Sequence, residues 1–545
     1  MDVEPEKVEA TLARIKPQLE AQDFELIARL WSTLMLVMRL VRAQRASLAR
    51  LRRLFGLSTS EKTREVTGAS VEASQSDPEC AAGGSAAQGA RDGEAEAAGK
   101  TKPKGHGRLG VSDYPTAVHH AVLHAELKVG ERCPLCERGS LYMLEEPARI
   151  LRILGQPLLA AHCWDCQRFR CSGCGHVFTA QAPGEAQGPK FDETAVAMIG
   201  LCRYGTGLPL HRLERLQRNV QTPLSSSTQW DALDQNAPAL RPAFEHMERV
   251  AAQGSVIHDD DTYVRILSFM GERRAKLLQA GELPDPDRTG LYTTAVVSNT
   301  EQGTVALFYS GRKHAGENLN KLLMARDPER AAPILMSDAL SRNVPKDHVV
   351  VEANCTAHAR RGIVDQFPNF PAECRTVLLL LREVYAVEAD CKARKLALDK
   401  RLAEHQGRSE PVMSQLHAFM TEELASKRAE PNSGLGKAYQ YMLKRWDKLT
   451  LFLRVAGAPL ESNICERALK MAIYHRRNSL FYRAQHGATV GDTFTSLIHT
   501  AELHGKNPFE YLTALLRHAR AVAEQPAAWM PWSFEATLAG LAAGA

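Results

Sequence analysis

Residues 255–267 read SVIHDDDTYVRIL. Apolar and β-branched residues surround three consecutive aspartates, and Gly254 precedes the run. Short segments of this kind, bounded by turn residues, are typical of strands. Because side chains alternate between the two faces of a strand, Asp260 is expected to point away from Asp259 and Asp261. The stretch therefore predicts a strand with one carboxylate on a face of its own.

Further strands are predicted on the C-terminal side of this stretch. The runs are LYTTAVVSN at 291–299, TVALFYSG at 304–311, APILMSDA at 332–339 and HVVVEANC at 348–355. The segment ENLNKLLMARD, at 317–327, has a helical pattern and separates the third strand from the fourth. Hairpin-like strands followed by a strand–helix–strand unit predict a mixed α/β sheet with both faces covered.

Acidic residues lie at or near the ends of these elements. Asp260 is in the first strand, Asp338 ends the fourth, and Glu466 lies in the first turns of a helix that begins near Ser462. Carboxylates at neighbouring strand ends project into one crevice, where α/β proteins bind ligands. Three carboxylates suit Mg²⁺, and two such ions can clamp the oxygens of a phosphoryl transfer. The alternative is that these residues are ordinary caps and solvated charges.

Six of the twelve cysteines form three CxxC pairs. This spacing lets two thiolates of one turn reach a tetrahedral Zn²⁺ at about 2.3 Å, and repeated pairs favour zinc over a redox motif. We favour one site made by Cys133, Cys136, Cys171 and Cys174, because glycines that ease tight turns lie beside these pairs. Cys163 and Cys166 replace one pair or join His162 or His176 in a second site.

The N-terminal segment carries apolar residues in steps of three and four from Ile27 to Phe55, with Gln44 as the single polar position. This pattern predicts either a coiled coil over four heptads or an amphipathic helix packed on its own protein. Six arginines between Arg39 and Arg53 lie outside the apolar seam, and they either contact DNA or form a solvated face. The following stretch lacks large apolar residues, so 62–108 is predicted to be a disordered linker.

Composition excludes some classes of protein. The 545 residues are 44% hydrophobic and 24% charged, which is ordinary for a globular protein. No apolar run approaches the roughly 20 residues that span a bilayer, and the acidic start MDVEPEKVEA does not resemble a secretory signal. The formal charge of +5 permits a nucleic-acid partner without demanding one.

Several motifs, in order along nearly the whole chain, resemble those of insertion-sequence 66 family transposases. RLFGLSTSEK at 53–62 resembles the end of the family's arginine-rich helix, and CPLC with CSGC resembles its zinc-binding domain. HDDDT at 258–262 and MSDA at 336–339 resemble its two aspartate motifs. The remaining similar blocks are ANCTAHARRGIVD at 353–365, ESNICERALK with HRRNSLF at 461–481, and AAWMPWSF at 527–534.

The resemblance implies a ribonuclease-H-like catalytic domain with an Asp-Asp-Glu active site. By their positions in the motifs, Asp260, Asp338 and Glu466 would be catalytic and would hold Mg²⁺ or Mn²⁺. The reaction would be DNA strand cleavage at the ends of an insertion sequence, followed by strand transfer into target DNA. Basic residues near these motifs would grip phosphates, and those that we select are Arg360, Arg361, Arg467, Lys470, Arg476 and Arg477.

The expected organisation is that of a multidomain α/β protein. The parts are a basic coiled-coil helix (1–61), the linker (62–108), a zinc-binding domain (109–182), a helical DNA-binding-like unit (191–252), the first catalytic part (253–375), a helical insertion (376–455), the glutamate helix with the end of the catalytic domain (456–500), and a C-terminal helix and tail (501–545).

The resemblance also implies partners and a location. The partners would be the terminal repeats and target DNA, a second copy or a higher homo-oligomer, and small accessory proteins of the element, with no membrane. The location would be the bacterial cytoplasm with the nucleoid. Two competing functions remain: a zinc-containing DNA-binding regulator without catalysis, and a structure-selective nuclease of the same fold without a joining step.

Overall fold

The computed structural model describes residues 177–543 apart from Pro284, together with parts of 128–174 and four residues between 14 and 31. Contacts divide the chain into two units. The larger comprises residues 1–73, 189–210 and 227–545, and the smaller comprises 74–188 and 211–226. The coiled coil and the linker predicted at 1–61 and 62–108 fall outside the described residues, except for those four positions.

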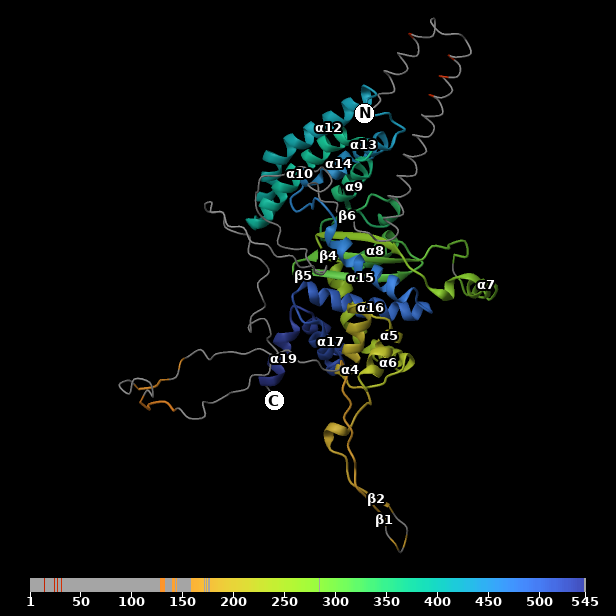
Figure 1. Cartoon of the computed structure of the whole chain (residues 1–545), viewed down its shortest axis with the longest axis vertical. Coiled ribbons are helices and arrows are strands. Elements are labelled where there is room, and N and C mark those ends of the chain that lie inside the picture. The colour runs from red at the N-terminus through yellow and green to blue at the C-terminus, as the bar shows by residue number, and fades with distance from the viewer. Residues whose placement is uncertain are drawn as a thin grey trace. The chain divides into compact units, whose positions relative to one another are not determined.

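The larger unit contains a five-stranded mixed sheet in the order β5-β4-β3-β6-β7. Figure 1 labels three of these strands, β4, β5 and β6. β3 runs antiparallel to β4, and β4 antiparallel to β5, whereas β3, β6 and β7 run parallel. The bounds are β3 (Val256–Tyr263), β4 (Tyr292–Thr300), β5 (Gly303–Gly311), β6 (Ile334–Ser337) and β7 (Val351–Asn354). The prediction of a mixed sheet is confirmed, and the aspartate-rich stretch forms its central strand.

Helices cover both faces of this sheet. α15 (Asn463–Ser479) packs on one face, where Cys465, Ala468 and Leu469 form an apolar cluster with residues of β4 and β5 such as Ala295. α8 (Ala315–Leu323) lies on the other face, where Asn318 donates a hydrogen bond to Thr294 Oγ1 at 2.9 Å. Neighbouring residues of β4 therefore contact different helices, as the alternation of a strand requires.

The edge strand β5 is closed by polar side chains of α16 (Gln485–Leu503). Its outward backbone N–H groups, those of Ser310, Phe308 and Ala306, donate to Asp492, Ser496 and Thr500 at 2.6, 2.9 and 3.1 Å. Four helical residues rise about 6 Å and two strand residues about 6.8 Å, so the two spacings match along the contact. The helix thus satisfies an edge that would otherwise be free to pair with another strand.

A helical segment follows the sheet, between β7 and α15. Its apolar core, which includes Leu381, Met420 and Tyr439, is continuous with Met336 and Ala353 of the sheet. In Figure 1 its helices gather beside β6. Their bounds are α9 (Thr356–Gln366), α10 (Pro371–Ala393), α11 (Leu398–Glu404), α12 (Glu410–Ala425), α13 (Gly434–Lys444) and α14 (Trp446–Leu449), with a π-helical turn at His405–Ser409.

Other helices of the larger unit precede and follow these elements. Residues 501–545 are predicted as a helix and tail. Their described part contains the end of α16 and three further helices, and its side chains include the buried Trp529. The remaining bounds are α4 (Glu193–Gly200), α6 (Ser226–Ala251), α7 (Gly271–Gln279), α17 (Pro508–Arg517), α18 (Ala519–Glu524) and α19 (Phe534–Ala543).

The described part of the smaller unit is sparse. It contains an antiparallel pair, β1 (Arg168–Arg170) and β2 (Val177–Thr179), and most of α5 (Leu210–Asn219). Among the helices described in either unit, none is long and apolar enough to cross a membrane.

The contact between α16 and β5 gives a prediction about stability. Replacing the buried Ser496 by Ala leaves the Phe308 N–H without its acceptor, so the free energy of unfolding should fall by about 1–3 kcal/mol. The control is Ser426→Ala, an exposed serine that bonds only its own helix, which should change the value by less than about 0.5 kcal/mol. Urea unfolding measures both, and equal values for the two variants would refute the structural role of the contact.

Candidate active site

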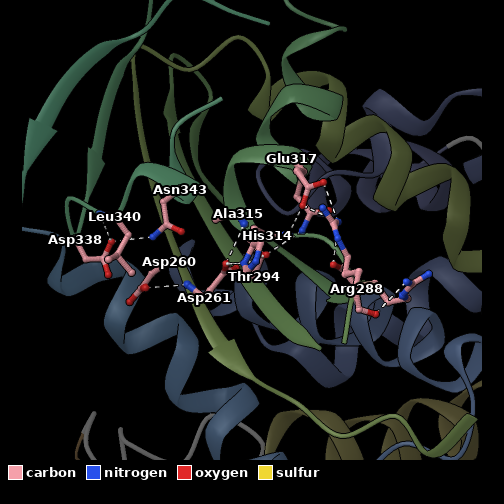
Figure 2. Close-up of polar contacts among 12 residues, drawn as sticks. Asp260, Asp261, Arg288, Thr294, His314, Ala315, Glu317, Asp338, Leu340 and Asn343 are labelled. Carbon is pink, nitrogen blue, oxygen red and sulfur yellow. Dashed lines mark hydrogen bonds and ion pairs between the residues drawn. The ribbon is translucent and has the colours of Figure 1, made fainter. Parts of the chain in front are cut away.

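The three aspartates of β3 point to different faces of the sheet. Asp261 turns toward α8, where its carboxylate accepts hydrogen bonds from Thr294 Oγ1 at 2.6 Å and from the Ala315 N–H at 3.0 Å (Figure 2). This carboxylate is therefore occupied in holding the positive N-terminus of α8. Asp260 pairs directly with Ala295, whose side chain belongs to the cluster under α15. Asp260 thus stands on the face that carries the glutamate helix.

Asp338 follows β6 immediately, and parallel pairing of β3 with β6 brings it beside Asp260 (Figure 2). Its Oδ1 accepts from the Leu340 N–H at 3.1 Å and from Asn343 Nδ2 at 2.8 Å. Ala339, between Asp338 and Leu340, has a φ of 70°, a left-handed conformation that costs a non-glycine residue roughly 1–2 kcal/mol. This strained turn brings the Leu340 N–H back to the Asp338 carboxylate. Backbone strain of this kind is common at functional sites.

Glu466 lies in the first turn of α15, whose start is fixed by Ser462. The Ser462 N–H donates to Cys355 Sγ at 3.2 Å, and its hydroxyl contacts His258 Nδ1 at 3.2 Å. Burial lowers the pKa of His258 to about 4, so this imidazole is neutral near pH 7. β3, the start of α9 and the start of α15 are therefore joined directly behind the glutamate.

The side chain of Glu466 faces two side chains of α9, the His358 imidazole and the Arg361 guanidinium. Its Oε1 lies 3.4 Å from His358 Nε2, and its Oε2 lies 3.8 Å from the Arg361 guanidinium. At these separations the contacts are electrostatic, and Oε1 has no hydrogen-bond donor among the described residues. Burial raises the pKa of the neighbouring Cys355 thiol to about 11, and His358 faces the glutamate.

The three candidate carboxylates act on one another through their charges. Burial first, and then the negative charge of Asp338, raises the pKa of Asp260 from 3.8 to about 7, and Glu466 adds to the effect. Such a shift at a group with charged neighbours is typical of functional sites. Asp259, fully buried on the opposite face, has a pKa raised well above its usual value mainly by burial, and neither of its oxygens has a partner in the described part of the chain.

The donor chemistry of this set fits a hard divalent cation. The hydrogen bonds given for Asp260 and Asp338 reach only Oδ1 of each, and Glu466 Oε1 also lacks a donor, so each carboxylate keeps an oxygen for another ligand. Cations with oxygen preference, such as Mg²⁺, take such ligands. Within the described residues no group of three or more His, Cys, Asp or Glu is already gathered tightly enough to hold an ion, so binding would have to draw the carboxylates together.

The six basic residues selected from the sequence have different surroundings. Arg361 faces Glu466, and Arg476 donates to Thr262 Oγ1 at 3.0 Å at the end of β3, so both contact the protein itself. Arg360 is half-buried in α9. The exposed residues of the set are Arg467, Lys470 and Arg477, all on α15.

Sequence reasoning missed several residues that shape the site. Asn343 holds Asp338 from the loop after β6, and the Tyr441 hydroxyl donates to the Asp338 carbonyl oxygen at 3.0 Å from the helical insertion. No sequence signal marks either contact, because both depend on how distant segments pack. His358 could have been found, since it lies three residues before Arg361 and helical spacing places both on one face.

The zinc site stays a prediction. Cys133, Cys136 and Cys171 lie outside the described residues. Cys163 and Cys174 are exposed, and Cys166 is half-exposed.

The raised pKa of Asp260 gives a prediction about pH. The folded state keeps its proton between about pH 4 and pH 7 while the unfolded state loses it, so this group lowers the unfolding free energy as pH rises through that window. Asp260→Asn removes the effect, and its stability relative to wild type should grow by up to about 1.4 kcal/mol per pH unit there. Urea unfolding with a chelator measures this. Parallel stability–pH profiles of wild type and Asp260→Asn would contradict this prediction. The control is Asp399→Asn, a change of an exposed aspartate, whose profile should parallel that of wild type.

Comparison with known proteins identifies the family. A protein-family model described as "Transposase IS66 family" matches residues 189–490. Two similar proteins of Sinorhizobium fredii (strain NBRC 101917 / NGR234) are named only as uncharacterized. Protein y4jD is 27% identical over 389 residues, covering 69% of this chain and 73% of its own. Protein y4hP is 26% identical over 395 residues, covering 68% and 67%. Because the family match spans more than half of the 545 residues, the chain belongs to the IS66 family of transposases.

Proposed function

We propose that this transposase cuts DNA at the ends of an insertion sequence and joins the freed ends to target DNA, with Asp260, Asp338 and Glu466 as its catalytic residues. The observation that carries the proposal is that Asp338, after the end of β6, and Glu466, in the first turn of α15, lie near enough to Asp260 of β3 for their charges to raise its pKa.

We further infer a ribonuclease-H-like catalytic domain. Three strands in antiparallel order followed by two parallel strands, with a helix packed on the central strands, support this assignment. The helices between β7 and α15 form an insertion that separates the second aspartate from the glutamate in sequence. The insertion still contacts the site, because Tyr441 binds the backbone of Asp338.

Asp260, Asp338 and Glu466 would together hold Mg²⁺ or Mn²⁺. When bound, two such ions activate a water nucleophile and stabilise the charge on the leaving oxygen of a phosphodiester. The protein's own contribution is positioning. Asn343 and the Leu340 N–H hold Asp338, while His358 lies against the glutamate and the Arg361 guanidinium faces its charge.

The reaction has two balanced steps. In the first, water attacks the phosphorus at the element's end, the P–O3′ bond breaks, and the products are a 3′-hydroxyl and a 5′-phosphate. In the second, that 3′-hydroxyl loses its proton and attacks a phosphorus of target DNA, forming a new phosphodiester and releasing a target 3′-hydroxyl. Both steps exchange one P–O bond for another, so positioning and charge neutralisation account for most of the catalysis.

The remaining parts would bind and organise DNA. Arg467, Lys470 and Arg477 form an exposed basic face on the helix that carries the catalytic glutamate, and side chains of this kind bind phosphates. Cys133, Cys136, Cys171 and Cys174 would hold Zn²⁺ in a DNA-binding unit, with Cys163 and Cys166 replacing one of these pairs or contributing to a second site. The N-terminal helix would pair two copies. Such a protein would act at the nucleoid of a bacterial cell, with accessory proteins of the element as partners.

Single substitutions test the catalytic assignment. We expect strand transfer to be abolished by each of three single substitutions, Asp260→Ala, Asp338→Ala and Glu466→Ala. Each removes one carboxylate of the proposed metal site. Binding of terminal-repeat DNA should persist. The measurement is a Mg²⁺- or Mn²⁺-dependent cleavage and joining assay on DNA that carries the terminal repeats. The matched control is Asp259→Ala, whose stability shows how far the loss of a neighbouring aspartate affects folding.

The outcomes separate the competing functions. Wild-type transposition by any of the three alanine variants would remove that residue from the site. Metal-dependent nicks without joined products would favour the structure-selective nuclease. DNA binding without any nick, under all divalent metals tried, would favour the non-catalytic regulator.

A further inference from the structure

A cleft of about 650 Å³ lies directly beside Asp338, on the side of the helical insertion. One wall is the loop that begins at Ala339, and the other is formed by the end of α13 and by α14. Glu352 and Asn354 of β7 also line it. The volume falls within the range of about 300–1,000 Å³ that is usual for ligand sites. None of the basic residues selected from the sequence lines this cleft.

The lining is predominantly cationic. Lys346 comes from the loop, while Lys444, Arg445 and Lys448 come from the insertion. Two carboxylates oppose these four cations, and one of them, Glu352, is already neutralised by Lys448 at 2.7 Å. Lys346 and Lys444 are exposed, and neither forms an ion pair within the described part of the chain. The cleft therefore has cations available for an anionic ligand.

The cleft is also connected structurally to the candidate active site. Arg445 lies over the ring of Tyr441 at 4.2 Å from its centroid, and the Tyr441 hydroxyl donates to the Asp338 carbonyl oxygen at 3.0 Å. A ligand that contacts Arg445 thus lies one side chain away from the backbone of the second aspartate. The side chain of Leu340, two residues after Asp338, is 42% exposed and offers an apolar surface in the same cleft.

One buried polar group indicates that the ligand carries a hydrogen-bond donor as well as negative charge. Asn354 is only 2% exposed, and its carboxamide oxygen has no hydrogen-bond partner among the described residues. A buried acceptor without a donor is costly, so it marks a place where a ligand or water donates. Phosphate groups satisfy the cations, and an amino group of a base on the same strand, or a bridging water, would donate to this oxygen. A DNA strand carries both the phosphates and the base amino groups.

We propose that this cleft holds the sugar-phosphate backbone of the DNA strand that continues from the phosphodiester at the carboxylates, with Lys346 and Lys444 binding its phosphates. The proposal rests on the function proposed above, because it takes the strand at Asp338 as the substrate. It assigns the helical insertion a role in substrate binding in addition to its packing against β7.

The test is the salt dependence of DNA binding. The variant is Lys346→Gln/Lys444→Gln, and the probe is a fluorescent duplex that carries the terminal repeat. Binding is measured in EDTA, so that it does not depend on cleavage. Each lost phosphate contact should reduce the slope of log K against log salt by about 1, so the double variant should lose about 2. Its affinity at 0.15 M salt should fall about tenfold or more.

Two further variants distinguish a local contact from general charge. Lys346→Arg/Lys444→Arg keeps the cations and should restore the slope. Lys276→Gln/Lys400→Gln removes two exposed lysines of α7 and α11 that do not line the cleft, and it should bind nearly as wild type. A wild-type slope for the cleft variant, or an equal loss for the control pair, would overturn the proposal.

Neutral methylphosphonates place the contact on the strand. Replacing single phosphates within a few nucleotides of the cleavage position should weaken wild-type binding but have little further effect on the cleft variant, since the two changes remove the same contact. Additive losses at every position would overturn the assignment of this strand. Failure of the wild type to cut in Mg²⁺ would instead count against the proposed function, and the binding result would stand apart from it.

Discussion

The position of β3 in the sheet is the constraint on which the candidate site depends. Its antiparallel neighbour β4 and its parallel neighbour β6 fix its register, and that register sets Asp260 beside Asp338. Like charges held this close in a partly dry site repel each other, and the pKa of Asp260 rises to about 7 as a result of burial and of that repulsion. The fold thus stores an unfavourable interaction that a bound cation would relieve.

The rest of the larger unit maintains this arrangement. α16 closes the edge of β5 with Asp492, Ser496 and Thr500, so the sheet ends without an exposed edge strand there. α9 brings His358 and Arg361 to the glutamate, and Ser462 joins the start of α15 to β3. The insertion reaches Asp338 through Tyr441. Segments distant in sequence therefore position Asp338 and Glu466 beside β3.

The strands and the carboxylate positions were predictable because their signals are local. β-branched runs bounded by turn residues indicate strands, and the alternation along 258–262 separates Asp260 from its two neighbours. α16 was not predicted, because the face that it buries carries Asp492, Ser496 and Thr500 and breaks the apolar periodicity of a packed helix. Asn343 and Tyr441 could not be assigned either, since their contacts with Asp338 arise only when the loop and the insertion pack together.

Joint metal binding by the three carboxylates is the central claim, and calorimetric titration of the zinc-saturated protein with Mn²⁺ at pH 7 tests it most directly. Running the titration in buffers of different ionisation enthalpy counts the protons released. Wild type should bind Mn²⁺ and release protons, because the raised pKa of Asp260 leaves its carboxyl partly protonated. Asp338→Asn and Glu466→Gln should each weaken binding by about tenfold or more. Unchanged Mn²⁺ affinity in Asp260→Asn and Asp338→Asn would contradict the account, because the metal would then lie elsewhere.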